Sequence, residues 1–279
     1  MTMCYIDRGI LLIKKVWAFV KRDFQNEISY KFSFLLQLFG IFINVSVFFF
    51  LSKLFGTSQI PQLAQYGGNY FAFVLIGIAF NYYLSVSLYS ISHSIREGQM
   101  TGTLEALLVT QTEIPTIIIS SSIYSFLFAT VRVIVFIIIG VIFYDLDLSR
   151  ANYLGALIIL FISIVSFSSF GILSASFVMV LKKGDPIASI LNGLSWLLGG
   201  VYYPIAILPA WLRVCSYFLP ITYSLEGMRL ALINGVSLDE LLPNILLLLV
   251  FTSVLIPISI YSFQYAVRLA KRDGSLTHY

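Results

Sequence analysis

Six stretches of the chain are apolar enough and long enough to cross a lipid bilayer, and this pattern limits the fold more than any other feature. A helix needs about 20 apolar residues to span the hydrocarbon core. The stretches run over residues 32–52, 70–92, 115–143, 153–181, 187–204 and 243–267. Hydrophobic residues make up 59% of the 279 and charged residues 11%, too little polar surface for a soluble domain of this length. We therefore predict an all-α integral membrane protein, folded as one domain over residues 1–279.

The residues before the first stretch predict an amphipathic helix at 8–28 rather than a signal peptide, since no long uncharged apolar core follows a basic start. Lysine and arginine fall on other faces than the apolar positions, which suits a helix lying on the membrane surface. The alternative is a helix packed on the body of the protein. The apolar positions, spaced three and four apart, are Ile10, Ile13, Trp17, Val20 and Phe24.

The basic residues predict the orientation of the spans. With the N-terminus inside, twelve lysines and arginines fall in cytoplasmic segments and four in outer ones, so both termini are expected inside. The outer four are Lys53, Arg150, Arg213 and Arg229. The fifth stretch is short and ends in Gly199-Gly200, so we expect it to bend or break before it fully crosses.

Metal, disulfide and nucleic-acid chemistry find no support in the sequence. Cys4 and Cys215 lie far apart and on opposite sides of the predicted topology, so a disulfide between them is not expected. His93 and His278 are too few for a metal site without carboxylates. The basic residues stand between apolar runs rather than on one soluble face, which sets topology and does not indicate nucleic acid.

The segment between the second and third stretches has the pattern of a separate short helix. Gly98 and Gly102 are expected to break the helix that leaves the membrane, and Thr103 can cap a new one. Such a helix either docks into a groove on a partner or rests on the bilayer, and the residues alone leave both open. Its apolar face would consist of Leu104, Leu107 and Leu108.

Two motifs in the chain resemble those of ABC-2-type transporter permeases. The first, Arg96-Glu97-Gly98 followed by residues 102–110, is similar to the family pattern R-E-x-G-T-L-E-x-L-L-V-T-P before the third span. It departs in the residues inserted after Gly98 and in Gln111, where proline is usual. The resemblance covers essentially the whole chain. The second motif consists of Gly200-Val201-Tyr202-Tyr203-Pro204, Leu208-Pro209-Ala210-Trp211-Leu212, Leu219-Pro220-Ile221-Thr222-Tyr223 and Glu226-Gly227-Met228-Arg229.

The resemblance implies the membrane-spanning subunit of an ATP-binding-cassette exporter. Two such permeases pair, here as a homodimer, and each binds an ATP-binding subunit that holds ATP and Mg, so no cofactor and no ATPase site are expected in this chain. The implied location is the plasma (inner) membrane of a prokaryote, or a plastid. Lys182 and Lys183 would form a second contact with the ATPase or only set the topology. The main coupling contact would consist of Glu97, Gly98, Gly102, Thr103, Leu104, Glu105, Leu107 and Leu108.

Residues 205–242 are broken by prolines and rich in aromatic residues. They are too short to cross twice as ordinary helices, but can dip into the outer leaflet as a re-entrant pair covered by protein. In the family such a segment closes the outer end of the pathway; the alternative is an outer helix anchored by its aromatic residues. Glu226 and Arg229 could pair on one helical face. The candidate gate residues are Pro204, Pro209, Trp211, Pro220, Tyr223, Glu226 and Arg229.

Arg132 is the one charged residue inside a predicted span. Its insertion costs on the order of 3 kcal/mol, so it should face protein, water or the headgroups, and a contact with an anionic substrate is the functional alternative. In the fourth stretch, small residues indicate either a polar translocation surface or close helix packing. These residues are Ser163, Ser166, Ser168, Ser169, Gly171, Ser174, Ala175 and Ser176.

Two other classes of membrane protein fit less well. An ion-coupled secondary transporter usually carries carboxylates in its spans, and the six stretches contain no Asp or Glu. A membrane enzyme would need a cluster of catalytic groups, whereas the acidic residues here are scattered, with Asp145 and Asp147 as a close outer pair. No lysine directly follows a glycine, so a Walker A loop is absent. Residues 30–37 lack the stretch typical of polysaccharide exporters, which favours a drug, lipid or other amphiphile as substrate.

Overall fold

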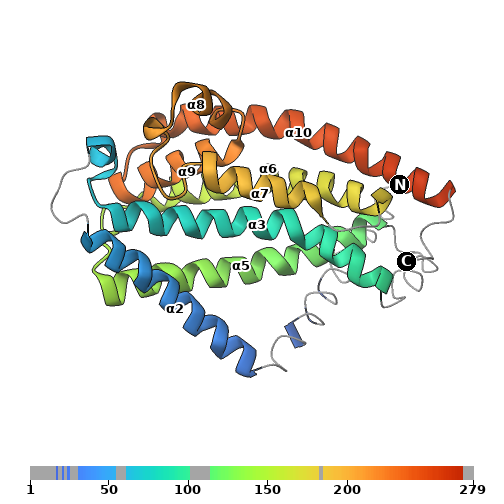
Figure 1. The fold of residues 1–279 in the computed structure, drawn as a ribbon, viewed down its shortest axis with the longest axis horizontal. Coiled ribbons are helices and arrows are strands. Elements are labelled where there is room, and N and C mark those ends of the chain that lie inside the picture. The colour runs from blue at the N-terminus through green and yellow to red at the C-terminus, as the bar shows by residue number, and fades with distance from the viewer. Residues whose placement is uncertain are drawn as a thin grey trace, which may run out of the picture.

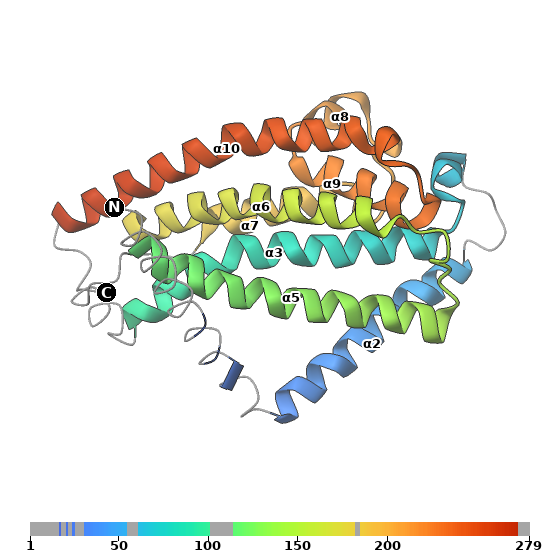
Figure 2. The ribbon, with the colours of Figure 1, turned by 180° about the vertical axis from the view of Figure 1, so that it is seen from behind.

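The computed structural model is a bundle of antiparallel helices (Figures 1 and 2) and describes residues 17, 21, 24–25, 31–54, 61–100, 114–181 and 185–272. The all-α membrane fold is confirmed: every described element is helical, and five helices are long and apolar enough to cross a membrane. The long helices are α2 (Lys31–Leu54), α3 (Tyr70–Met100), α5 (Ile114–Tyr144), α6 (Tyr153–Leu181) and α10 (Leu238–Arg272). The short elements are η1 (Pro61–Tyr66), α7 (Pro186–Leu198), η2 (Ile205–Ile207), α8 (Ala210–Ser216), α9 (Pro220–Arg229) and η3 (Leu230–Asn234).

The apolar stretches locate the long helices to within a few residues. The stretch at 153–181 coincides with α6, and those at 32–52 and 115–143 end within one or two residues of the ends of α2 and α5. The helix α10 begins five residues before its predicted span and contains Pro243 and Pro257. Proline is tolerated inside membrane helices because neighbouring helices and side chains satisfy the freed backbone groups.

Of two sequence predictions about helix ends, one was wrong and one was confirmed. Gly98 does not break its helix, since α3 continues to Met100; a glycine inside a helix costs only about 1 kcal/mol, which the flanking residues can offset. The fifth stretch, 187–204, is helical only up to Leu198 and thus breaks before it fully crosses, as expected. There the chain turns at Gly199 and at Gly200, which has a φ of +75° that only glycine adopts readily.

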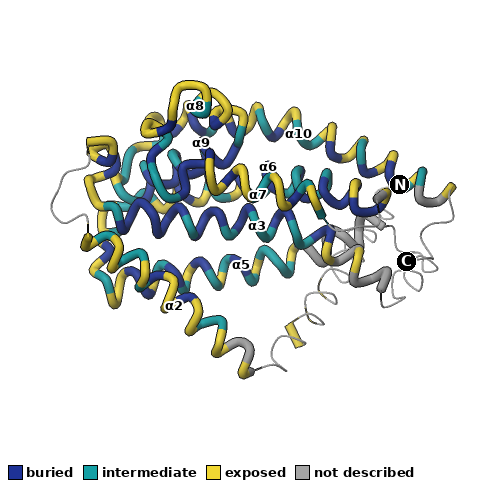
Figure 3. The backbone as a smooth tube through the Cα atoms, in the orientation of Figure 1, coloured by how far each residue is buried: buried dark blue, intermediate teal, exposed yellow. Residues whose placement is uncertain are grey.

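The helix α3 forms the centre of the bundle. Of its most apolar stretch, 78% is buried, against 11% for α2 and 22% for α5 and α10. Figure 3 shows the same contrast between a dark α3 and the exposed faces of α2 and α10. The end of the bundle that holds η1, residues 145–152 and η3 is called the outer end below, after the predicted topology, and the opposite end the inner end.

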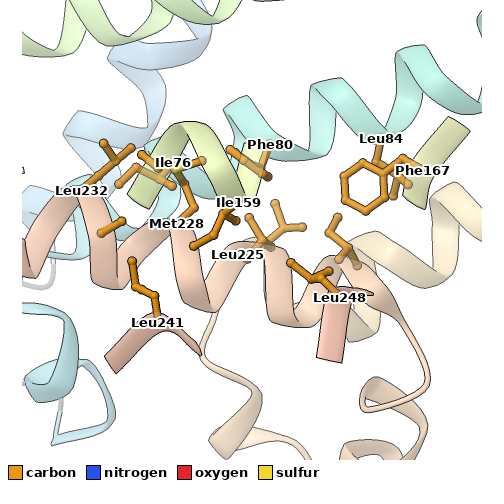
Figure 4. Packing of buried hydrophobic residues seen from close by; sticks show 14 of the residues in the cluster. Ile76, Phe80, Leu84, Ile159, Phe167, Leu225, Met228, Leu232, Leu241 and Leu248 are labelled. Atoms are coloured by element: carbon orange, nitrogen blue, oxygen red, sulfur yellow. The ribbon is translucent and has the colours of Figure 1, made fainter. Parts of the chain in front are cut away.

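The largest apolar cluster joins α3, α6, α9 and α10 in the outer half of the bundle (Figure 4). Phe80, Ile159, Leu225 and Leu248 are each at most 4% exposed and bring one residue from each helix into it. A smaller cluster of Ile91, Met179 and Phe263 holds the inner halves of α3, α6 and α10 together.

Most of the small residues of α6 serve helix packing. Ser166 and Ser174 are fully buried. At Gly171 the helix touches α3 so closely that an added Cβ would collide with the carbonyl of Ser87. The structure therefore favours close packing over a polar translocation surface along this helix.

The predicted N-terminal helix lies mostly outside the described residues. Its four described residues are helical, and Trp17 and Phe24 are 68% and 56% exposed. The body of the protein does not cover these two apolar side chains, as a helix on the membrane surface requires.

Candidate functional site

The chain from α7 to α9 crosses the bundle in two short pieces rather than as one span. α7 has 13 residues, a length of about 20 Å, against about 30 Å for the hydrocarbon core. After an excursion through η2 and α8, the chain re-enters the bundle at Pro220 and runs as α9 and η3 to the outer end (Figures 1 and 2).

Contacts fix the depth of α9. The hydroxyl of Ser163 donates to the Ser224 hydroxyl over 2.8 Å, and Ser163 lies about 15 Å along α6 from its outer end. The rings of Tyr223 and Phe251 lie 5.7 Å apart. At the opposite end of this segment, the N–H of Asn152 donates to the carbonyl of Ala231 over 2.8 Å. The segment α9–η3 therefore fills the outer half of the bundle from its middle to its outer end.

Arg229 is the residue that ties this segment to the rest of the bundle. It is 3% exposed. Its Nε donates to the carbonyl of Phe73 in α3 over 3.1 Å, and Nη2 donates to the carbonyl of Val201 over 3.0 Å. The guanidinium also lies 3.4 Å from the centre of the Phe73 ring and 5.9 Å from that of Tyr66. One side chain thus joins α9, α3, η1 and the turn after α7.

Glu226 and Arg229 attract each other electrostatically, as their spacing predicts, but the hydrogen bonds of the guanidinium are longer-range contacts. Spacing of three along a helix brings two side chains near each other, but the guanidinium donates to carbonyl oxygens of α3 and of the turn. Gly77 makes this arrangement possible, because a Cβ there would collide with the Val201 carbonyl. The basic residue counted among the outer charges is therefore a buried structural cation.

The other candidate gate residues divide between buried and exposed positions. Pro204 and Pro220 are buried, and Pro220 opens α9 at a position where its missing N–H is not needed. Tyr223 donates from its hydroxyl to the carbonyl of Tyr217 over 3.0 Å. Pro209 and Trp211 begin α8 and are exposed, Trp211 by 69%. An aromatic ring at such a position suits the membrane interface.

Arg132 lies at the middle of its span and contacts α3. It is eighteen residues from the start and twelve from the end of α5. Nη1 donates to the hydroxyl of Tyr82 over 3.0 Å, and the guanidinium lies 4.5 Å from the centre of the same ring. Its Nε is buried and has no hydrogen-bond partner among the described residues.

At the inner end, most of the predicted coupling residues lie outside the described part of the chain. Residues 101–113 and 182–184 belong to this group, with Lys182 and Lys183. Glu97 and Gly98 lie in the last turn of α3. Close to Lys182 and Lys183 in sequence, Asp185 caps α7. Its Oδ1 accepts the N–H of Ala188 over 3.0 Å and a hydrogen bond from Ser174 of α6.

The outer acidic pair forms a turn. Asp147 accepts the N–H of Ser149 over 2.9 Å, and this hydrogen bond holds the pKa of its carboxyl below the usual value. Asp145 has a φ of +52° at the end of α5. The carboxylate of Asp147 therefore stabilises the loop between α5 and α6.

The profile of ABC-2 type transporters matches residues 14–233. The chain belongs to the ABC-2 type transporter family. Among curated proteins none matches this sequence. As a member of the family, the ABC-2 chain is the multi-pass permease component of an ABC transporter, and the ATPase site is not part of this component. The match ends within η3, so it includes α7, α8 and α9 but not α10.

Three features of this ABC-2 permease were not found from the sequence. Tyr82, the partner of Arg132, is one of 17 tyrosines and has no distinguishing neighbour. The carbonyl acceptors of Arg229 carry no side-chain signal at all. The cap at Asp185 could have been predicted, because Asp followed by Pro is a typical start of a helix.

Proposed function

We propose that this ABC-2 permease exports an amphiphile, a drug, lipid or glycolipid, with energy from ATP hydrolysed by a separate subunit. The observation that carries the proposal is the outer half of the bundle, which α9 and η3 fill as a buried segment. A permease closed on its outer side can load substrate from the inner leaflet without a leak. A movement of α9 that breaks the contacts of Arg229 with α3 and with the turn after α7 would then open the outer exit.

The proposal assigns ATP and Mg to a partner ATP-binding subunit at the inner end. Glu97 and Gly98 at the end of α3, with the segment that follows, would receive the movement of that subunit. Asp185 supports this arrangement, because it connects α6 to the start of α7 directly beside the second proposed contact at Lys182 and Lys183. A movement of the chain at Lys182 and Lys183 would be transmitted to α7. Through Gly199 it would then reach the turn after α7, which Arg229 holds by its hydrogen bond to Val201.

The proposal also includes a second copy of the chain and a cytoplasmic position of both termini in the plasma or inner membrane. Asn44 supports the pairing. It is exposed in the middle of α2 and has no hydrogen-bond partner among the described residues. A polar amide that faces hydrocarbon is stabilised by a hydrogen bond to a neighbouring helix, which a second permease can supply.

Copurification tests the function. The permease, tagged and extracted from its native membrane in mild detergent, should bring with it one ATP-binding-cassette subunit per copy. Leu104→Asp with Leu108→Asp should release that subunit, whereas the matched control Ile207→Asp, at an exposed position beyond α7, should retain it. Absence of an ATPase from the wild-type preparation would refute the proposal, and ion-driven uptake would then be measured.

A further inference from the structure

Arg132 lies far from both ends of its helix. Its distances to the two ends of α5 are about 27 and 18 Å along the helix. Side chains on a helix tilt toward its N-terminus, so this one points back toward the middle of the helix. The guanidinium accordingly lies on the Tyr82 ring of α3 at the same depth rather than at the headgroups.

The charge of Arg132 has no counter-ion in the described spans. Within the five apolar spans of the described residues, Leu35–Leu54, Tyr70–His93, Ile123–Tyr144, Tyr153–Val180 and Leu238–Leu269, the only carboxylates are Asp239 and Glu240, in the first turn of α10 at the outer end. The guanidinium has one neutral partner, the Tyr82 hydroxyl, and a buried Nε without a partner among the described residues. A charge in a membrane span normally pairs or marks a substrate path.

The hydrogen-bond chemistry of the pair is that of an anion site. The Tyr82 oxygen accepts from Arg132, so the hydroxyl proton is left to donate. The remaining guanidinium N–H groups also only donate, in a planar arrangement that suits phosphate or carboxylate oxygens. Two residues on neighbouring helices therefore have donors left over, and the pair carries a positive charge.

The departure of α2 from the bundle opens this place to lipid. Arg132, Phe136 and Ile139 share one face of α5, and the latter two pack against Ile41 and Val45 of α2. Toward the inner end α2 leans away from the bundle (Figures 1 and 2). The side chains on that part of α2 are uncovered: Phe32, Leu35, Leu36 and Phe39 are between 52% and 77% exposed. Arg132 lies one helical turn from Phe136 toward the inner end, and it is half-buried.

We propose that Arg132 and Tyr82 bind the anionic headgroup of a membrane-borne amphiphile, which enters from the bilayer between α2 and α5. The apolar residues of α2 face the tails while the guanidinium and the hydroxyl hold the headgroup halfway across the membrane. This inference deepens the proposed function, because it names an anionic amphiphile as the substrate class, and it rests on that function for the transport step. Binding itself requires only the permease.

The test compares two lipids that differ in charge alone. Wild-type permease in mild detergent is titrated with a phosphatidylglycerol and a phosphatidylcholine of identical chains, and the first binding step is followed by native mass spectrometry. We expect the wild type to prefer the anionic lipid. Arg132→Gln should weaken its binding about tenfold or more, as expected for the loss of a charged hydrogen bond, and leave phosphatidylcholine binding unchanged. Tyr82→Phe, which keeps the ring, should weaken it less.

Controls separate this site from a general charge effect. Arg150→Gln removes a charge from the exposed outer turn and should keep the preference for the anionic lipid. Loss of this preference in Arg150→Gln would overturn the assignment. So would equal binding of the two lipids by the wild type, or an unchanged preference in Arg132→Gln. Displacement by free glycerol 3-phosphate would show a site for soluble anions and refute the amphiphile. A permease that lacks an ATPase partner yet keeps the preference would refute only the proposed function.

Discussion

Replacement of Arg229 by lysine should harm the protein more than replacement by methionine. The guanidinium is 3% exposed, donates to the carbonyls of Phe73 and Val201 and stacks on the Phe73 ring. Lysine keeps the positive charge in this dry place but cannot make both hydrogen bonds and the flat stacking contact together. The loss of one charged hydrogen bond, at about 1.5–3 kcal/mol, and of part of the cation–ring attraction, at about 1 kcal/mol, gives about 2–4 kcal/mol.

Methionine removes the charge with the donors. The Val201 carbonyl is then left unpaired, which costs about 1–3 kcal/mol, but no cation has to be buried, and this offsets part of the loss. We expect a net cost of about 1–2 kcal/mol. At about 2–4 °C per kcal/mol, the lysine variant should unfold about 4–16 °C below the wild type and the methionine variant about 2–8 °C below it.

The assay is thermal unfolding in one detergent at one heating rate, followed by intrinsic fluorescence. Arg213→Lys is the matched control, since Arg213 also donates from Nη2 to two carbonyls, those of Ala206 and Leu208. It is partly exposed in α8, so water can replace the lost bond and the change should stay within about 1 kcal/mol. If Arg229→Lys unfolds at the wild-type temperature, or above Arg229→Met, the site is wet and the reasoning is wrong.

Three further changes test other contacts by the same unfolding measurement. Gly171→Ala should destabilise by about 1–3 kcal/mol, because its Cβ has no room against α3, whereas Gly193→Ala, with open space around it, should be neutral or stabilising by up to about 1 kcal/mol. Ser224→Ala, which breaks the buried hydroxyl pair between α9 and α6, should cost about 0.6 kcal/mol and at most about 1.7. Asp185→Ala removes the cap of α7 and should cost about 0.5–2 kcal/mol; an unchanged midpoint would refute the cap.

The sequence predicts the long helices well because the bilayer requirement is so strict. A run of about 20 apolar residues has few other stable forms, so α2, α5 and α6 begin and end close to where the apolar stretches do. Where lipid does not set the length, the prediction is weaker. The inner end of α3 extends beyond Gly98, and α7 stops at Leu198 because a glycine turn intervenes.

The sequence indicated which segment forms the candidate site, but not which residues contact one another in it. The prolines and aromatic residues of 205–242 indicated an unusual segment, and the structure contains α8 and α9 there. Local spacing suggested an ion pair for Arg229, yet its acceptors are the backbone carbonyls of Phe73 and Val201, 156 and 28 residues away in sequence. Backbone acceptors look alike in every residue, so only the packed fold shows which ones meet a given side chain.

Arg229 and Arg132 both lie inside the bundle, but they differ in the hydrogen-bond partners of their guanidinium groups. This difference separates a structural role from a functional one. Arg229 is almost fully buried, and its charge is held by two carbonyls and a ring face. Arg132 has one neutral partner and a buried Nε that no described residue meets. A guanidinium held by two carbonyls and a ring stabilises the fold, whereas the Arg132 N–H groups that neither Tyr82 nor burial occupies are available to a ligand. Substitution of Arg229 should therefore lower the unfolding temperature before it changes binding, whereas substitution of Arg132 should weaken anionic lipid binding at an unchanged unfolding temperature.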